Sequence, residues 1–132
     1  MAEADARSLL TIACRDLQAA QGMTDVCVFH EAVWGFQLQQ AVEKGLKAWL
    51  YLLDQDPPFT HDLVALFKLL EHAGIDITAY RELARFTDFA VQIRYDEQPD
   101  LQNLDRCAWN GKAEALVLAL KGLLPPARTT GH

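Results

Sequence analysis

Apolar residues recur every three or four positions through most of the chain, which is the spacing of a helix with one buried side. In the first stretch, for example, Leu10, Ala13 and Leu17 would share one face. Alternation of apolar and polar residues, which would indicate strands, extends over no useful length. The pattern predicts an all-α protein, an up-and-down bundle of four or five helices joined by short loops.

Glycine and proline interrupt this pattern at Gly22, Pro57-Pro58, Gly74, Pro99 and Pro125-Pro126. The segments between them predict helices over about residues 4–20, 26–53, 61–73, 79–95 and 101–124. The second helix would be about 40 Å long at about 1.5 Å per residue, which indicates the central helix of the bundle. Residues 1–124 are expected to form a single domain, and residues 125–132 a flexible tail.

Capping residues indicate where two of these helices begin and end. Thr60 can cap the third helix, and Asp62 would meet the positive end of its dipole. Gly74 would end the same helix, and Thr78 can cap the fourth.

One side of the predicted second helix is polar. Its residues are Gln37, Gln40, Lys44 and Lys47, with Glu43 beside them. They fall within an arc of roughly 80° when each residue is turned by about 100° from the last. The stripe is either a solvated face opposite a packed one, or the lining of a groove or subunit interface. Gly45 costs such a helix about 1 kcal/mol relative to alanine, so we expect a close helix–helix approach there.

Composition and charge narrow the function classes. A chain of 132 residues with 51% hydrophobic residues can bury a substantial core as one domain. Its 12 Lys and Arg against 18 Asp and Glu give a net charge of −6, which argues against a broad nucleic-acid surface. A nucleotide site would instead be a local patch around Lys44, Lys47 and Arg94.

The cysteines and the N-terminus indicate a cytoplasmic protein. Cys14, Cys27 and Cys107 lie far apart without a CxxC pair, which is typical of reduced thiols, and their apolar surroundings predict core positions. The N-terminus carries Glu3 and Asp5 and no continuous apolar run, so it does not read as a signal peptide. No apolar stretch is long enough to span a membrane.

Familiar enzyme and metal motifs each fail at a named residue. His30-Glu31 begins like the zinc motif HExxH, but Trp34 stands where the second histidine should be. Gly111-Lys112 resembles the end of a phosphate loop without its first glycine or its serine or threonine. We therefore expect no metal, no cofactor and no self-contained catalytic set. His61 stays open as an acid–base, capping or packing residue, and the tryptophans (Trp34, Trp49 and Trp109) are expected to pack in the core or an interface.

Four separated stretches carry a family resemblance. Residues 7–17 read RSLLTIACRDL, residues 36–48 FQLQQAVEKGLKA, residues 60–63 THDL and residues 90–95 AVQIRY. In this order they resemble the RxLLxxAxxDL, FHAQQAxEKxLKA, THDL and AxxxRY motifs of HEPN domains, the "higher eukaryotes and prokaryotes nucleotide-binding" family. The resemblance covers about residues 5–124.

The resemblance implies a helical bundle that is commonly a homodimer. Many such proteins associate with a minimal nucleotidyltransferase that carries the metal-binding carboxylates, while the HEPN subunit helps to hold the nucleotide or substrate. Another branch, often toxins of toxin–antitoxin pairs, cleaves RNA with an arginine followed four to six residues later by a histidine. Here Arg94 is followed only by the distant His132, so the ribonuclease pair is absent. Gln37 also replaces a histidine of the family, which removes a titratable group.

Carried over residue by residue, the resemblance assigns ligand or partner contacts to Gln40, Glu43, Lys44, His61, Arg94 and Tyr95. The polar stripe adds Gln37 and Lys47. A structural interpretation stands beside this one, in which Glu43 pairs with Arg94 between helices while Tyr95 and His61 complete a hydrogen-bonded network.

The leading hypothesis is a non-catalytic HEPN subunit that partners a small nucleotidyltransferase. Two alternatives remain open. One is a divergent ribonuclease toxin with a site around Arg94 and His61, and the other is a purely structural dimerisation module.

Overall fold

The computed structural model describes residues 2–92 and 104–126 of the chain. Its elements are α1 (Ala2–Gln21), α2 (Glu31–Leu52), α3 (Leu63–His72), the 3₁₀ helix η1 (Arg81–Asp88), α4 (Phe89–Gln92) and α5 (Arg106–Leu123). No strand occurs among the described residues. The prediction of an all-α bundle is confirmed.

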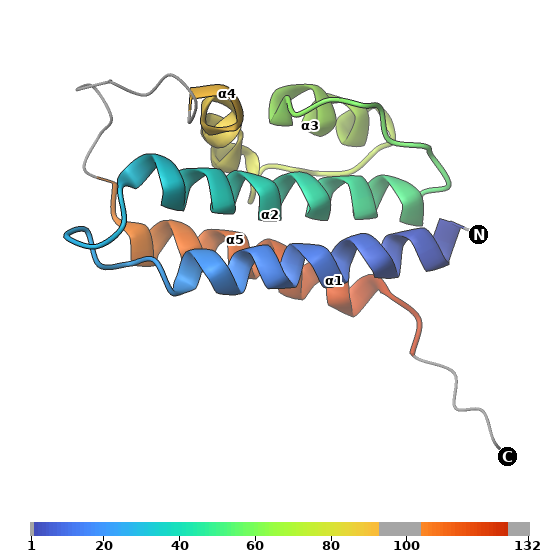
Figure 1. The fold of residues 1–132 in the computed structure, drawn as a ribbon. Helices are drawn as coiled ribbons and strands as arrows, with labels where there is room; N and C mark the ends of the chain where they lie inside the picture. The colour runs from blue at the N-terminus through green and yellow to red at the C-terminus, as the bar shows by residue number, and fades with distance from the viewer. Residues whose placement is uncertain (1, 93–103, 127–132) are drawn as a thin grey trace, which may run out of the picture.

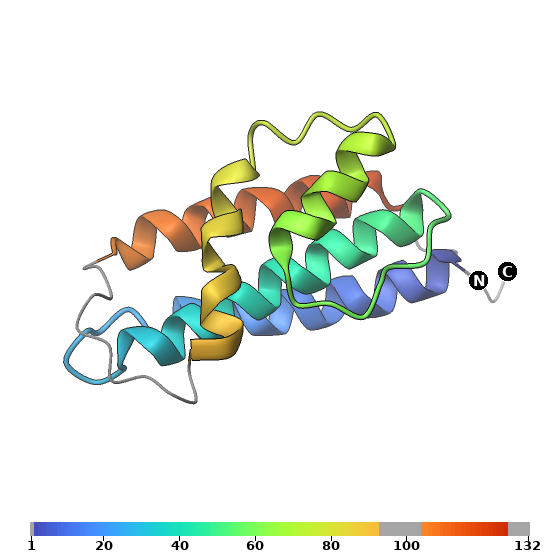
Figure 2. The same ribbon diagram turned by 90° about the horizontal axis from the view of Figure 1, so that it is seen from above.

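The long helix α2 lies at the centre of the fold. Helices α1 and α5 run lengthwise along one side of it, while α3, η1 and α4 lie on the other side (Figure 1). Seen from above, η1 and α4 cross over α2 (Figure 2). Because α2 contacts all five other elements, its side chains are the ones that reach every part of the bundle.

Helix α2 begins later than the sequence predicts. Instead of starting near residue 26, it starts at Glu31, and the Nδ1 atom of His30 caps it by accepting from Ala32 N at 2.9 Å. Asp25 is the reason for the late start, because its side chain and carbonyl accept backbone N–H groups of the next residues and form a turn. Twenty-two residues make α2 about 33 Å long.

The caps of α3 differ from the prediction at one end and match it at the other. Asp62, and not Thr60, is the N-cap, with its Oδ1 accepting from Val64 N at 2.9 Å. Thr60 Oγ1 accepts from Asp62 N instead. Gly74 ends the helix as predicted, with a φ of 89° and with N–H groups after the helix closing on its last carbonyls.

The last two predicted helices begin later than expected. The fourth was predicted from residue 79 with Thr78 as its cap, but η1 starts at Arg81 and Tyr80 precedes it without a side-chain cap. The fifth starts at Arg106 rather than at residue 101, because Asp105 Oδ1 caps it by accepting from Ala108 N. The predicted helical residues 93–95 and 101–103 lie outside the described residues, as do 127–132 of the predicted tail.

An aromatic cluster joins α2 to η1 and α4. Trp34 is fully buried, and its ring meets Phe86 edge to face with centroids 5.4 Å apart. Phe86 stacks on Phe89 at 5.3 Å. The indole Nε1 of Trp34 donates to Asn110 Oδ1 at 2.9 Å, and Asn110 Nδ2 donates to Ala20 O. One amide therefore ties α1, α2 and α5 together.

The two remaining tryptophans pack as predicted, whereas the cysteines are less buried than predicted. Trp49 is buried as predicted, and Trp109 packs on Phe86 with its ring partly exposed. The predicted core positions of Cys27 and Cys107 are wrong, because both are exposed, and Cys14 is half-buried. No described helix is both long and apolar enough to cross a membrane.

Gly35 is packed more tightly than Gly45, where the close approach was predicted. A Cβ atom at Gly45 would lie 3.4 Å from Leu120 Cδ1, which is close to an ordinary contact. At Gly35 it would lie 2.2 Å from the Phe89 ring. The ring of Phe89 therefore rests directly on the backbone of α2.

Replacing Gly35 by alanine should destabilise the fold by about 2 kcal/mol, because the buried Phe89 ring must be displaced. Urea unfolding would measure the change. The matched control is Gly111→Ala on α5, where a Cβ atom meets nothing within 4 Å. That substitution should stabilise the helix by about 0.5–1 kcal/mol. Equal effects at the two sites would contradict the predicted clash.

Candidate functional site

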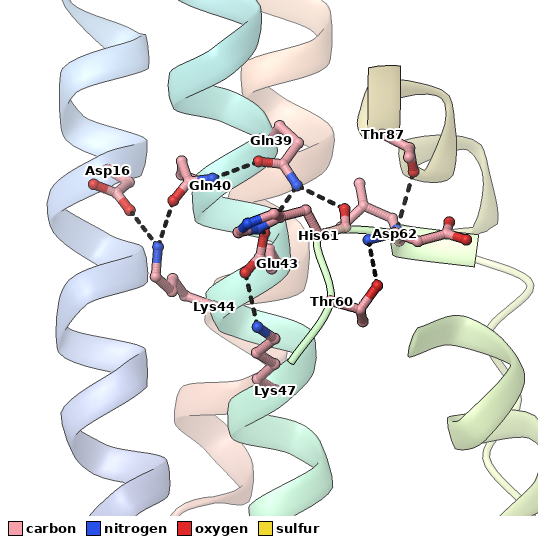
Figure 3. A network of polar contacts seen from close by, with 11 residues as sticks. Asp16, Gln39, Gln40, Glu43, Lys44, Lys47, Thr60, His61, Asp62 and Thr87 are labelled. Carbon is pink, nitrogen blue, oxygen red and sulfur yellow. Dashed lines mark hydrogen bonds and ion pairs between the residues drawn. The ribbon is translucent and has the colours of Figure 1, made fainter. Parts of the chain in front are cut away.

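The polar residues of α2 contact neighbouring elements on both sides (Figure 3). On one side, α1 contributes Asp16, and on the other, the segment before α3 contributes His61. Between them lie the α2 residues Gln39, Gln40, Glu43, Lys44 and Lys47. We call these seven residues the α2 network.

Lys44 connects the network to α1. Its Nζ donates to Gln40 Oε1 at 2.6 Å and lies 3.8 Å from Asp16 Oδ2. Gln40 Nε2 in turn donates to Gln39 Oε1 at 2.7 Å. Because the Lys44 and Asp16 side chains are only 22% and 23% exposed, solvent screens this ion pair incompletely.

Glu43 is the centre of the network and is 2% exposed. Its Oε2 accepts from Lys47 Nζ at 2.8 Å, while its Oε1 accepts from Gln39 Nε2 at 3.0 Å and contacts His61 Nδ1 at 2.9 Å. A buried carboxylate is tolerated only with partners of this kind. Glu43 therefore joins α2 to the segment that leads into α3.

His61 is anchored although its side chain is 69% exposed. Its carbonyl accepts from Gln39 Nε2 at 3.0 Å. The backbone N–H of Asp62 donates to Thr60 Oγ1. The backbone N–H of Leu63 donates to the Oγ1 atom of Thr87, a residue of η1. With Nδ1 against Glu43, the other ring nitrogen has no hydrogen-bond partner among the described residues.

The pKa values of the two carboxyl groups in the network, Glu43 and Asp16, are shifted in opposite directions. Burial by itself would raise the pKa of Glu43, but hydrogen bonds from Lys47, Gln39 and His61 and the charge of Lys47 outweigh it, so the pKa lies below its ordinary value of 4.5. Burial raises the pKa of Asp16, and Lys44 offsets only part of that effect. Glu43 thus keeps its charge more firmly than Asp16 does.

The lowered pKa of Glu43 predicts a pH dependence of stability. As the pH falls below 4.5, the unfolded chain takes up this proton before the folded chain does, so the stabilisation is lost as the pH passes through the lowered pKa. The wild type should have a higher free energy of unfolding than Glu43→Gln. This difference should be largest above pH 4.5 and should become smaller in acid. Urea titrations at several pH values would measure it, and a constant gap would contradict the prediction.

Five of the predicted site residues come together in the α2 network: Gln40, Glu43, Lys44, Lys47 and His61. Gln37 is half-buried and is not part of the network. Arg94 and Tyr95 lie outside the described residues, so the Glu43–Arg94 ion pair stays a prediction. The partners of Glu43 that are described are Lys47, His61 and Gln39.

Two members of the network were missed by sequence reasoning. Gln39 is fully buried and lies off the polar arc, so helical periodicity did not group it with the polar stripe. Asp16 sits on another helix, one residue before the core residue Leu17. Both residues lie in stretches that resemble the HEPN motifs, Asp16 in residues 7–17 and Gln39 in residues 36–48. A polar residue next to apolar ones in these stretches was the signal that could have identified them.

An apolar pocket of about 440 Å³ lies elsewhere, at the end of α2. Trp49, Tyr51 and Leu53 line it, together with Glu3 and Asp54. No Lys or Arg is among its described lining residues, so these residues offer no cationic side chain to a phosphate group. The α2 network is therefore the better candidate site.

A model of the HEPN domain family matches residues 6–123, a range that includes the whole α2 network. No curated protein and no solved structure shows significant similarity to the chain. Among the described residues, no group of three or more His, Cys, Asp or Glu side chains is arranged to hold a metal ion.

Proposed function

The chain belongs to the HEPN domain family, and from this premise we propose that it is a non-catalytic, cytoplasmic subunit that helps a small nucleotidyltransferase to hold its nucleotide or substrate. The observation that carries the proposal is the anchored, solvent-facing imidazole of His61. A buried carboxylate, Glu43, holds one side of this ring, and Lys44 and Lys47 belong to the same network. We further propose that the protein forms a homodimer through apolar helix faces.

The charge balance of the network favours a site shared with another subunit. The ammonium groups of Lys44 and Lys47 face the carboxylates of Asp16 and Glu43, so the four charges cancel. A polyphosphate needs surplus positive charge, which the network alone lacks. We therefore expect weak nucleotide binding by the isolated subunit and tighter binding once a partner adds its own cations or metal ion.

Affinity capture from native cells, followed by calorimetry, tests the proposal. A nucleotidyltransferase should co-purify, and the complex should bind one of ATP, GTP or CTP. His61→Ala should weaken that binding about tenfold or more, by removal of a hydrogen bond to a charged group. Lys68→Ala, an exposed lysine on α3, is the matched control and should change nothing. Recovery of the protein alone, as a dimer, would contradict the partner model.

A ribonuclease toxin is the second candidate, and the Glu43–His61 contact is the observation that favours it. A carboxylate that orients an imidazole is a common arrangement for a general base. Purified protein would be incubated with total RNA. Cleavage that disappears in both His61→Ala and Arg94→Ala would favour the toxin, whereas intact RNA would favour the binding subunit. If neither nucleotide binding nor cleavage is seen, alone or in complex, a purely structural module is the remaining interpretation.

A further inference from the structure

Phe59 is the most exposed large apolar side chain among the described residues, at 106% of its reference accessible area. It lies in the loop between α2 and α3, directly after Pro57-Pro58. Single exposed apolar residues are common on protein surfaces, so exposure alone carries no conclusion. The construction of the loop and its charge are what distinguish this side chain.

The loop that carries Phe59 is fixed at both ends. On the α2 side, Asp54 adopts a φ of 59°, and Gln55 N donates to Leu50 O at 2.9 Å. On the α3 side, Leu63 N donates to Thr87 Oγ1 at 3.0 Å.

The centre of the loop is restrained as well. The two prolines restrict the chain just before Phe59, and Thr60 N donates across it to Pro58 O at 3.0 Å. A ring presented on so restrained a backbone loses little conformational entropy on binding.

The charge of the loop selects the kind of partner. Between Lys47 and Lys68 the chain contains three aspartates, Asp54, Asp56 and Asp62, and no lysine or arginine. All three aspartates are exposed. Such a surface repels the phosphate backbone of nucleic acid, and a second copy of this acidic chain would meet like charge. A protein surface with basic residues is complementary to it.

We propose that Phe59 is an anchor residue that inserts into an apolar pocket, rimmed by lysine or arginine, on a partner protein. The inference rests on the proposed function in that it assigns the surface by which the partner subunit is held. We call residues 54–60 the docking loop. This loop lies directly before His61, so the partner would approach the α2 network from the α3 side.

Site-specific crosslinking tests the proposal. The variant Phe59→p-benzoylphenylalanine is added to a native-cell lysate and irradiated, and the crosslinked peptides are sequenced. A crosslink to one other protein, at an apolar site flanked by Lys or Arg, is the expected result. The same photoreactive residue in place of Leu118, an exposed residue of α5, is the matched control and should not trap that peptide.

The trapped partner, purified, then provides an affinity measurement. Phe59→Ser should weaken binding by about 30-fold or more, as the loss of an anchor residue does, while leaving the melting temperature unchanged. The double variant Asp54→Asn, Asp56→Asn should slow association and reduce its salt dependence. Leu118→Ser should have no effect on binding.

Different outcomes separate this inference from the proposed function. If a nucleotidyltransferase binds wild type and Phe59→Ser equally well, the proposed function stands and the docking loop is overturned. If the trapped protein meets the criteria above but is not a nucleotidyltransferase, the docking loop stands and the proposed function fails. A crosslink only to a second copy of the chain or to nucleic acid, or no crosslink at all, overturns the inference.

Discussion

Replacing Glu43 by alanine is expected to lower the free energy of unfolding by about 3 kcal/mol at neutral pH. The substitution removes the acceptor of three donors, those of Gln39, Lys47 and His61. Gln39 is fully buried and the Lys47 side chain is largely buried. Water therefore cannot fully replace the hydrogen bonds that these two side chains lose. A charge left without its partner in such a place costs more than the original pair contributed.

Urea unfolding followed by circular dichroism would measure this loss. Glu43→Gln should cost less, because the amide keeps the shape and one acceptor oxygen. Glu114→Ala, at an exposed position of α5, is the control and should stay within about 0.5 kcal/mol of the wild type. A small effect of Glu43→Ala would mean that the network adds little to the fold, and would strengthen its assignment to ligand binding.

Replacing Trp34 by alanine should be the most damaging single change, at about 4 kcal/mol. The side chain is fully buried, and its ring contacts Phe86 and Phe89 at centroid distances of 5.4 and 6.5 Å. Its loss would leave a cavity at the crossing of α2 with η1 and α4. Asn110 would also lose the donor that its Oδ1 accepts from, deep inside the protein.

Thermal and urea unfolding of Trp34→Ala should be compared with Trp34→Phe and Trp109→Ala. The phenylalanine variant keeps much of the apolar contact but loses the hydrogen bond to Asn110 and part of the ring, so it should show an intermediate loss. Trp109 is partly exposed, with Arg85 over its ring at 5.3 Å, so its removal should cost less. Equal losses for Trp34→Ala and Trp109→Ala would contradict the central place given to Trp34.

The approximate positions of the helical segments could be predicted from the sequence, because apolar spacing and the glycine and proline positions both depend on local backbone rules. The fourth predicted helix is nevertheless two elements, η1 followed by α4. The exact starts could not be predicted, because several short polar side chains compete for the same backbone N–H groups. Thr60 and Asp62 both suit a cap, and only the tertiary position of the segment, held by Thr87, decides for Asp62. The 3₁₀ geometry of η1 likewise has no local signal that distinguishes it from an α-helix.

The candidate site could be predicted as far as one helix face allows. The rotation of about 100° per residue grouped Gln40, Lys44 and Lys47 correctly. It could not supply Asp16, which belongs to another helix, or show that Gln39 turns its amide toward Glu43 and the carbonyl of His61. Such contacts depend on how helices are placed next to each other, which periodicity does not encode.

The contact between Phe89 and Gly35 also limits how the small helices can move. Two packed helices usually slide past each other by small steps while their side chains stay interlocked. Here the Phe89 ring occupies the space that a side chain at position 35 would fill, so sliding α4 along α2 would drive the ring into the neighbouring residues. We therefore expect α4 to leave α2 by lifting away as a hinge. Hydrogen exchange in α4 should then show its amides opening together, as one event.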